Sequence, residues 1–319
     1  MTTRLGFTAP VMGFSLRESC ELAVRAEQLG YTDCWSAETS GCDGFSVASA
    51  VGVSTETMRI GLAVAPVFSR PPALTAMSAL AAHQASGGRF CLGLGASSPV
   101  IVGGWMGQPY EQPLTRMRET VEIVKAAFAG DKVKIQGRTV SSTGFRLEDA
   151  PGGSIPVFLA ALGPKMLALA SEVADGVALY LASEEGVRLA GKEAPDKELV
   201  ERIMCCPDEP SDQVRGAARW FMTPYLAVPA YNAFVARQGF ESEAVALASA
   251  WSVGDRTAAR DAVTDELIDA LVIHGPAEAC KERLDSFRDA GLSTPILGLF
   301  SVTSGKEGVA AALERLAPN

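Results

Sequence analysis

Short runs of apolar residues alternate along the chain with longer segments in which apolar residues recur every three to four positions. The short runs are typical of strands and the longer segments of helices. The clearest unit covers residues 58–98, where a strand, a helix and a second strand follow one another. Pro71 and Pro72 lie in the first turn of this helix, and Gly87 and Gly88 end it. Such a unit joins two parallel, neighbouring strands by a right-handed crossover.

The same alternation continues through the chain and fills eight strand positions. We predict strands at residues 4–8, 34–37, 59–65, 90–94, 155–160, 176–181, 199–206 and 295–300. Residues 270–274 compete with 199–206 for the seventh position. Strands that alternate with helices throughout favour an α/β fold of the (β/α)8 TIM-barrel class, with a doubly wound open sheet as the alternative.

Two segments depart from this alternation. Residues 131–150, around Gly137, have the pattern of a β-hairpin, and residues 183–269 hold more helices than one strand–helix unit needs. We interpret them as a hairpin excursion and a helical insertion. Because no internal repeat or low-complexity linker interrupts the chain, we predict a single domain over residues 1–319.

The composition indicates the cellular compartment and excludes some classes of binding partner. The 319 residues are 48% hydrophobic and carry a formal net charge of −9 without a cluster of Lys and Arg, so we expect no nucleic-acid partner. No apolar run has the length of a membrane-spanning helix, and the first residues enter a strand at once, so we expect neither a membrane span nor a signal peptide. The seven cysteines form no CxxC pair, which predicts reduced thiols in a cytoplasmic protein.

Candidates for a functional site lie at the carboxyl ends of the predicted strands, where barrels of this class carry their active sites. They are Thr8, Glu38, Ala63, Val64, Ala65, Pro66, Ala96, Ser97, Ser98, Ala160, Ala161, Leu162, Gly163, Pro164, Lys165, Tyr180 and Cys206. The carboxylate of Glu38 could hydrogen-bond a cofactor ring or act as an acid or base; a salt-bridged strand end is the alternative.

Two turns among these candidates suit parts of a cofactor. Residues 93–98 read GLGASS, which lacks the third glycine of a dinucleotide-binding motif, so a Rossmann site is not expected. Their small side chains would let an aromatic ring system lie close to the backbone, or they serve only packing. The turn at residues 161–165 precedes a helix whose positive end suits a phosphate, with Lys165 adding charge; an ordinary turn is the alternative.

Large side chains in the irregular regions could line an apolar substrate pocket, with core packing as the alternative. They are Phe68, Trp105, Met106, Tyr180, Trp220 and Tyr225. The two histidines, His83 and His274, have no partner at metal-ligand spacing, and the sequence holds no P-loop, HExxH motif or nucleophile elbow. We therefore expect no metal site.

Several short motifs occur in a fixed order along almost the whole chain. They are AVRAEQLG at residues 23–30, WSAE at 35–38, RIGLAV at 59–64, RPPA at 70–73, SGGRFCLGLG at 86–95, residues 116–123, IPV at 155–157 and residues 278–291. In this order they resemble the bacterial luciferase-like superfamily of flavin and deazaflavin oxidoreductases, and the SGGR–strand–GLG element is the most specific of them.

The resemblance implies a (β/α)8 barrel that holds coenzyme F420, or alternatively FMN, at its C-terminal mouth. It implies a bulge at Ala63–Val64, often with a non-prolyl cis peptide, that supports the cofactor ring. Together with the strand ends, it predicts as cofactor-binding Thr8, Glu38, Ala63, Val64, Ala65, Ala96, Ser97, Ser98, Ala161, Leu162, Gly163, Pro164 and Lys165. Glu38 and Ser98 are the predicted catalytic residues.

Some residues of this chain differ from those at the same positions in family members, and these differences argue against one reaction of the family. F420-dependent sugar-phosphate dehydrogenases carry a His and a Glu where this chain has Thr39 and Ser98, so their catalytic pair is missing. Many relatives carry Gly-Gly in the phosphate turn and Asn after the third strand, where this chain has Leu162-Gly163 and Pro66.

We therefore expect an F420-dependent oxidoreductase that moves a hydride between the deazaflavin and a neutral, largely apolar substrate with a carbonyl, enone or imine. YLAVPAY at residues 225–231 resembles the F420-dependent branch. Glu38, or a water held by Ser97 or Ser98, is the expected proton partner. The alternatives are an FMNH2-dependent monooxygenase fed by a separate reductase, and a barrel that binds flavin or another ligand without turnover.

The outer helices predicted at residues 45–54 and 73–85 are rich in Ala, Ser and Val and carry few charges. An outer barrel helix without a charged face favours a partner subunit. We therefore predict a homodimer.

Overall fold

The barrel closes through eight parallel strands. A computed structural model describes residues 4–152 and 155–318. The barrel strands are β1 (Gly6–Thr8), β2 (Asp33–Ser36), β3 (Arg59–Pro66), β4 (Phe90–Gly95), β7 (Val157–Ala160), β8 (Gly176–Tyr180), β9 (Glu198–Pro207) and β11 (Thr294–Leu299). Each strand pairs with its neighbours in this order, and β9 pairs with both β8 and β11. The predicted TIM barrel is confirmed.

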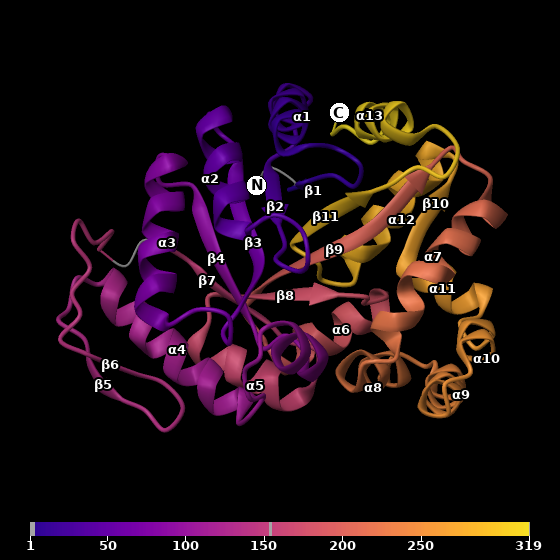
Figure 1. Cartoon of the computed structure of the whole chain (residues 1–319). Coiled ribbons are helices and arrows are strands. Elements are labelled where there is room, and N and C mark those ends of the chain that lie inside the picture. Colours follow the sequence, from indigo (N-terminus) through magenta and orange to yellow (C-terminus); the bar gives the residue numbers. More distant parts are fainter. Residues whose placement is uncertain (1–3, 153–154, 319) are drawn as a thin grey trace.

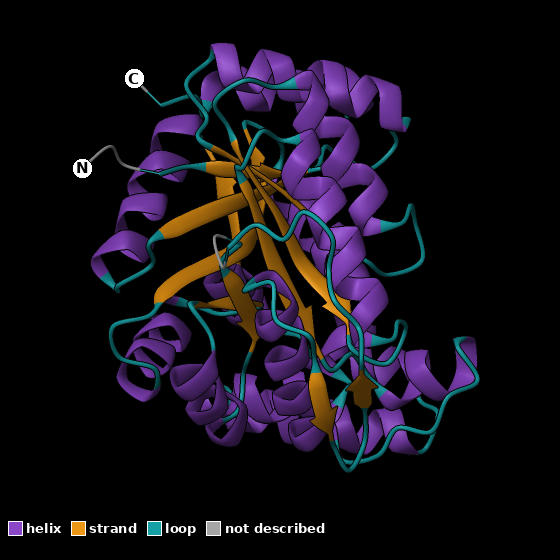
Figure 2. Ribbon diagram, turned by 90° about the vertical axis from the view of Figure 1, so that its left-hand side faces the viewer, coloured by secondary structure: helices purple, strands orange, loops and turns teal. Residues whose placement is uncertain are grey.

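Helices surround the barrel and connect its strands (Figures 1 and 2). They are α1 (Leu16–Gln28), α2 (Gly44–Ser54), α3 (Pro72–Ala85), α4 (Pro113–Phe128), α5 (Pro164–Val173), α6 (Glu184–Glu193), α12 (Ala277–Asp289) and α13 (Gly305–Arg315). Local sequence sets their starts: Ser15 and Glu18 form a capping box at α1, and a proline occupies the first turn of α3, α4 and α5.

Both candidates for the seventh position are strands, but only one belongs to the closed barrel. β9 fills the barrel position, whereas β10 (Val272–Gly275) pairs with the last four residues of β9. Over Glu198–Arg202 the same strand pairs with β8. The first half of β9 therefore pairs with β8, and its last four residues pair with β10.

The helical insertion is shorter than predicted. It consists of α7 (Ser211–Leu226), α8 (Pro229–Arg237), α9 (Glu241–Ser252), α10 (Arg256–Asp261) and α11 (Asp265–Leu271). The predicted range of 183–269 was wrong at its start, because α6 is the ordinary crossover helix between β8 and β9, and β9 itself lies inside that range. The insertion thus connects β9 to β10.

The predicted excursion at residues 131–150 is a hairpin of β5 (Lys134–Gln136) and β6 (Ser141–Thr143). Glu119 of α4 fixes its turn by accepting hydrogen bonds from the backbone N–H groups of Arg138, Thr139 and Val140. The hairpin extends from the side of the barrel beside α4 (Figure 1).

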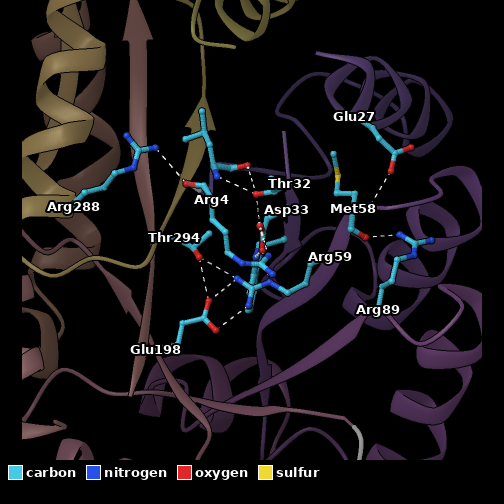
Figure 3. A network of polar contacts seen from close by, with 12 residues as sticks. Arg4, Glu27, Thr32, Asp33, Met58, Arg59, Arg89, Glu198, Arg288 and Thr294 are labelled. Atoms are coloured by element: carbon cyan, nitrogen blue, oxygen red, sulfur yellow. Dashed lines mark hydrogen bonds and ion pairs between the residues drawn. The ribbon is translucent and has the colours of Figure 1, made fainter. Parts of the chain in front are cut away.

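Charged side chains fill the amino-terminal end of the barrel (Figure 3). Asp33, which is completely buried, contacts Arg59 and lies 2.9 Å from the Nη1 atom of Arg4. Arg59 also donates to both carboxylate oxygens of Glu198, at 3.0 and 2.7 Å, and to the hydroxyl of Thr294 at 3.1 Å. These residues come from the ends of β2, β3, β9 and β11 and from the segment before β1, so the network ties the closed sheet together.

Aromatic side chains form the next layer above this network. The rings of Trp35 and Phe158 meet edge to face, with centroids 5.3 Å apart. Gly61 makes room for them, because a Cβ atom at this position would lie 2.1 Å from the ring of Trp35. These rings belong to a buried cluster inside the barrel that also includes Cys91, Ala178, Val200 and Ile296.

Glu201 on β9 points away from the barrel interior and is buried. Its Oε1 atom accepts a hydrogen bond from the backbone N–H of Ala182 at 2.8 Å, whereas Oε2 has no partner among the described residues. Burial raises the pKa of this carboxyl well above its ordinary value. The folded protein therefore favours the protonated side chain.

We expect Glu201→Gln to reduce the loss of stability with rising pH. An acid whose pKa is raised by folding destabilises the folded state as pH rises above the pKa of the unfolded chain. Relative to the wild type, the variant should therefore gain thermal stability between about pH 5 and about pH 8. Thermal unfolding across this range measures the difference, with Glu185→Gln on exposed α6 as the control. Parallel pH profiles for Glu201→Gln and the wild type would contradict it.

Candidate functional site

The carboxyl ends of β3 and β4 form one wall of the barrel mouth from backbone and small side chains. The Ala63–Val64 peptide bond is cis, and the pairing of β3 with β4 shifts register between Leu62 and Ala65. The predicted irregularity at Ala63–Val64 is confirmed. A Cβ atom at Gly95 would lie 2.3 Å from Cγ2 of Val64, so only glycine fits there. This wall is suited to support a flat ring.

Glu38 follows β2 and lies next to this wall. The Nη1 atom of Arg70 is 2.5 Å from its Oε1 atom, and Arg70 also contacts Asp43 and lies 5.0 Å above the ring of Phe45. The Oε2 atom of Glu38 is buried and has no partner among the described residues. Glu38 therefore forms a salt bridge at the end of its strand, as the alternative interpretation of the sequence predicted. Its Oε2 atom is left without a hydrogen-bond donor.

The loop after β4 continues the wall with Ala96, Ser97 and Ser98. Ser97 has a φ of 60°, and its carbonyl accepts a hydrogen bond from the hydroxyl of Tyr110 at 3.5 Å. Ser98 is buried and caps a short π-helix, η1 (Val100–Trp105), by accepting from the N–H of Ile101 at 3.4 Å. The hydroxyl of Ser98 is therefore partly engaged by its own loop.

The turn from Ala161 to Lys165 presents an open, positively polarised helix end. No side chain caps α5, whose N-cap is Gly163, and a Cβ atom at Gly163 would meet no atom within 4 Å. Arg237 of α8 donates to the carbonyl of Leu162 at 3.2 Å and pairs with Glu193. The exposed Lys165 has no ion pair within the described part of the chain. The free backbone N–H groups at the start of α5, the open space at Gly163 and the positive charge of Lys165 suit a phosphate group.

The six residues predicted to line a substrate pocket lie in separate places. Phe68 is buried between the ring of Tyr110, at 5.0 Å, and the guanidinium of Arg116, at 4.6 Å. Tyr180 and Tyr225 pack edge to face at 5.8 Å. Trp105 and Trp220 are exposed, by 59% and 69%, and Met106 ends η1 half-buried. Their role in a substrate pocket stays a prediction.

A small cavity lies between β1, β9, β11 and α7. It is lined by Thr8, Pro10, Val11, Met12, Arg202, Met204, Phe221, Gly298, Leu299 and Phe300. Of the predicted site residues, only Thr8 lies in it. Arg202 was not among the predicted site residues. Because side chains alternate between the two faces of a strand, Arg202 lies on the same face of β9 as the inward-facing Val200.

The described residues contain no cluster of three or more His, Cys, Asp and Glu side chains that could hold a metal ion. His274 is engaged by Ser211, at 3.1 Å, and by Asp269, at 2.8 Å. None of the helices in the described part of the chain is long and apolar enough to span a membrane.

Comparison with known proteins assigns the chain to a family of enzymes. Residues 2–294 match the sequence model of the luciferase-like monooxygenase family. The 5,10-methylenetetrahydromethanopterin reductase of Archaeoglobus fulgidus is 31% identical over 290 residues, which cover 86% of this chain and 86% of that protein.

Solved structures share the fold. The coenzyme F420-dependent tetrahydromethanopterin reductase from Methanopyrus kandleri superposes with a TM-score of 0.80 at 20% identity, covering 99% of this chain and 97% of that one. An F420-dependent secondary alcohol dehydrogenase, solved with an F420–acetone adduct, gives 0.78 at 17% identity over the whole of both chains. The chain belongs to the luciferase-like monooxygenase family and is an oxidoreductase of that family.

Proposed function

We propose that this protein binds coenzyme F420 at the carboxyl-terminal mouth of its barrel and transfers a hydride between this cofactor and a largely apolar organic substrate. The observation that carries the proposal is the juxtaposition of two features at one end of the barrel: the glycine-backed wall at Ala63–Val64 and the uncapped helix end at Gly163. Related proteins whose names include coenzyme F420 support the choice of cofactor.

The residues present fit this cofactor. The wall formed by β3 and β4 would support the ring, and the free Oε2 atom of Glu38 offers a hydrogen-bond acceptor beside it. Gly163, Lys165 and Arg237 would hold the phosphate and the acidic tail. When bound, the deazaflavin would supply or accept the hydride.

The remaining work falls to the chain's own side chains. Arg70 holds Glu38 in one orientation, and we propose that this carboxyl exchanges a proton with the substrate through a water held by Ser97 or Ser98.

Titration of the purified apo-protein with F420 and with FMN tests the choice of cofactor. We expect F420 to bind at least about tenfold more tightly, a difference of about 1.4 kcal/mol. Preference for FMN by the same factor would favour the FMNH2-dependent monooxygenase, which needs a separate reductase. Oxidation of reduced F420 by a panel of ketones, enones and nitro compounds separates an enzyme from a barrel that only binds the cofactor.

We also propose a homodimer that buries the outer faces of α2 and α3. Val53, Leu74 and Met77 on these helices are 73%, 46% and 52% exposed, and such an apolar surface favours a partner subunit. We expect light scattering at micromolar concentration to give the mass of a dimer. A monomer mass would contradict this arrangement.

A further inference from the structure

Arg202 is a cation without an anionic partner in the mouth of the barrel. It lies on β9 and lines the cavity next to Thr8. Its Nε atom is buried without a hydrogen-bond partner among the described residues, and none of their acidic groups forms an ion pair with it. The guanidinium lies 5.7 Å from the ring centre of Tyr180, which stabilises a cation but leaves its N–H groups unsatisfied.

A second polar side chain beside Arg202 lacks a partner. Gly298 of β11 is close to the guanidinium, since a Cβ atom there would lie 3.2 Å from the Nε atom of Arg202. The hydroxyl of Thr8, which lines the same cavity, is also buried without a partner among the described residues. Two hydrogen-bonding side chains thus lack partners around one cavity, and an unsatisfied polar group is costly unless a ligand completes it.

Arg202 lies opposite the wall assigned to the cofactor ring. In the closed barrel the strands follow the order β1, β2, β3, β4, β7, β8, β9 and β11, so β3 and β9 are separated by three strands in either direction. A substrate that lies against the ring therefore turns its far end towards β9. The cation accordingly belongs to the substrate side of the mouth.

We propose that the substrate carries a carboxylate and that Arg202 binds it, with the hydroxyl of Thr8 as a second donor. The guanidinium matches the two oxygens of a carboxylate and balances its single charge. No second Lys or Arg lines the cavity, and its other side chains are apolar, so a phosphate would leave charge unpaired. This inference rests on the proposed function and changes the neutral substrate expected from the sequence into an apolar monocarboxylate with a reducible carbonyl, enone or imine.

Binding of matched carboxylates and amides to the F420-loaded protein tests the inference. Benzoate, cinnamate and hexanoate are titrated calorimetrically beside benzamide, cinnamamide and hexanamide. We expect at least one carboxylate to bind about tenfold or more tightly than its amide, and Arg202→Met to abolish that preference. Arg202→Lys should keep part of it. Arg188→Met, which removes an exposed arginine of α6, is the matched control and should leave all affinities unchanged.

Three results would overturn the assignment: equal affinity of every acid and its amide, no saturable binding by any acid, or an unchanged preference in Arg202→Met. A tenfold loss of F420 affinity in Arg202→Met would instead assign the arginine to the cofactor and also reject the proposal. The melting temperature of Arg202→Met should stay equal or rise, because a cation without an ion pair is removed; a fall would indicate a structural role. If the wild type fails to bind F420, the proposed function fails, whereas the acid–amide comparison on apo-protein still tests Arg202.

Discussion

Asp33→Ala is expected to lower the free energy of unfolding by about 3–5 kcal/mol. Asp33 is completely buried and accepts hydrogen bonds from Arg4, Thr32 and the indole of Trp35, besides its contact with Arg59. Its removal leaves the partly buried Arg59 with Glu198 as its one carboxylate partner and takes the acceptor away from the buried indole N–H of Trp35. Removing one partner from a buried ion pair strongly destabilises the folded state, because the remaining charge stays buried without an opposite charge beside it.

Urea denaturation followed by circular dichroism measures this loss. Asp33→Asn, which keeps the shape and one acceptor oxygen, should fall between the wild type and the alanine variant. Glu314→Ala is the control, because its ion pair with Arg25 is about half exposed on both sides and should contribute at most about 1 kcal/mol. A change below about 1 kcal/mol for Asp33→Ala would show that the network does not hold the barrel together.

Glu38→Gln is expected to lower turnover well over tenfold while cofactor affinity stays within a few-fold. A positioned acid or base contributes about 100-fold to 10,000-fold to a proton transfer, and glutamine keeps the shape and an acceptor oxygen but cannot exchange a proton. Because Arg70 also contacts Asp43, it retains an anionic partner in the variant. The effect should therefore fall on kcat more than on folding.

Oxidation of reduced F420 by the best acceptor in the panel gives the rate, and F420 titration gives the affinity. Asp43→Asn is the matched control, since it removes the other carboxylate on Arg70 from a position at the start of α2. If Glu38→Gln abolishes F420 binding, Glu38 anchors the cofactor and the proton partner lies elsewhere. An unchanged turnover with unchanged affinity would remove Glu38 from the mechanism altogether.

Most of the fold could be predicted because turn residues mark the strand ends. The strand predicted at residues 90–94 is Phe90–Gly95, set off by Gly87 and Gly88 on one side and by small residues on the other. The late insertion could not be bounded as well. β9 and β10 are both short apolar segments next to helices, and only their pairing shows that β9 closes the barrel while β10 extends it.

The candidate site could be predicted only where local backbone chemistry defines it. The wall at Ala63–Val64 follows from small residues and from the resemblance to the family. The cations around the mouth do not, because their contacts join distant segments: Arg70 lies 32 residues from Glu38, and Arg237 lies 75 residues from Leu162. The contact of Phe68 with Arg116 likewise joins segments 48 residues apart.

The position of β10 has a consequence for how such enzymes diversify. The features assigned to the cofactor lie between Glu38 and Lys165, with Arg237 as the exception, whereas α7 to α11 leave the barrel after β9 and return on β10, outside the closed sheet. A gene segment encoding residues 208–271 can therefore lengthen, shorten or be exchanged without breaking a barrel strand pair. A chimera that receives this segment from a relative should keep the closed barrel and the wall at Ala63–Val64, while the side chains that α7 and α8 bring to the mouth, Phe221 and Arg237 among them, are exchanged.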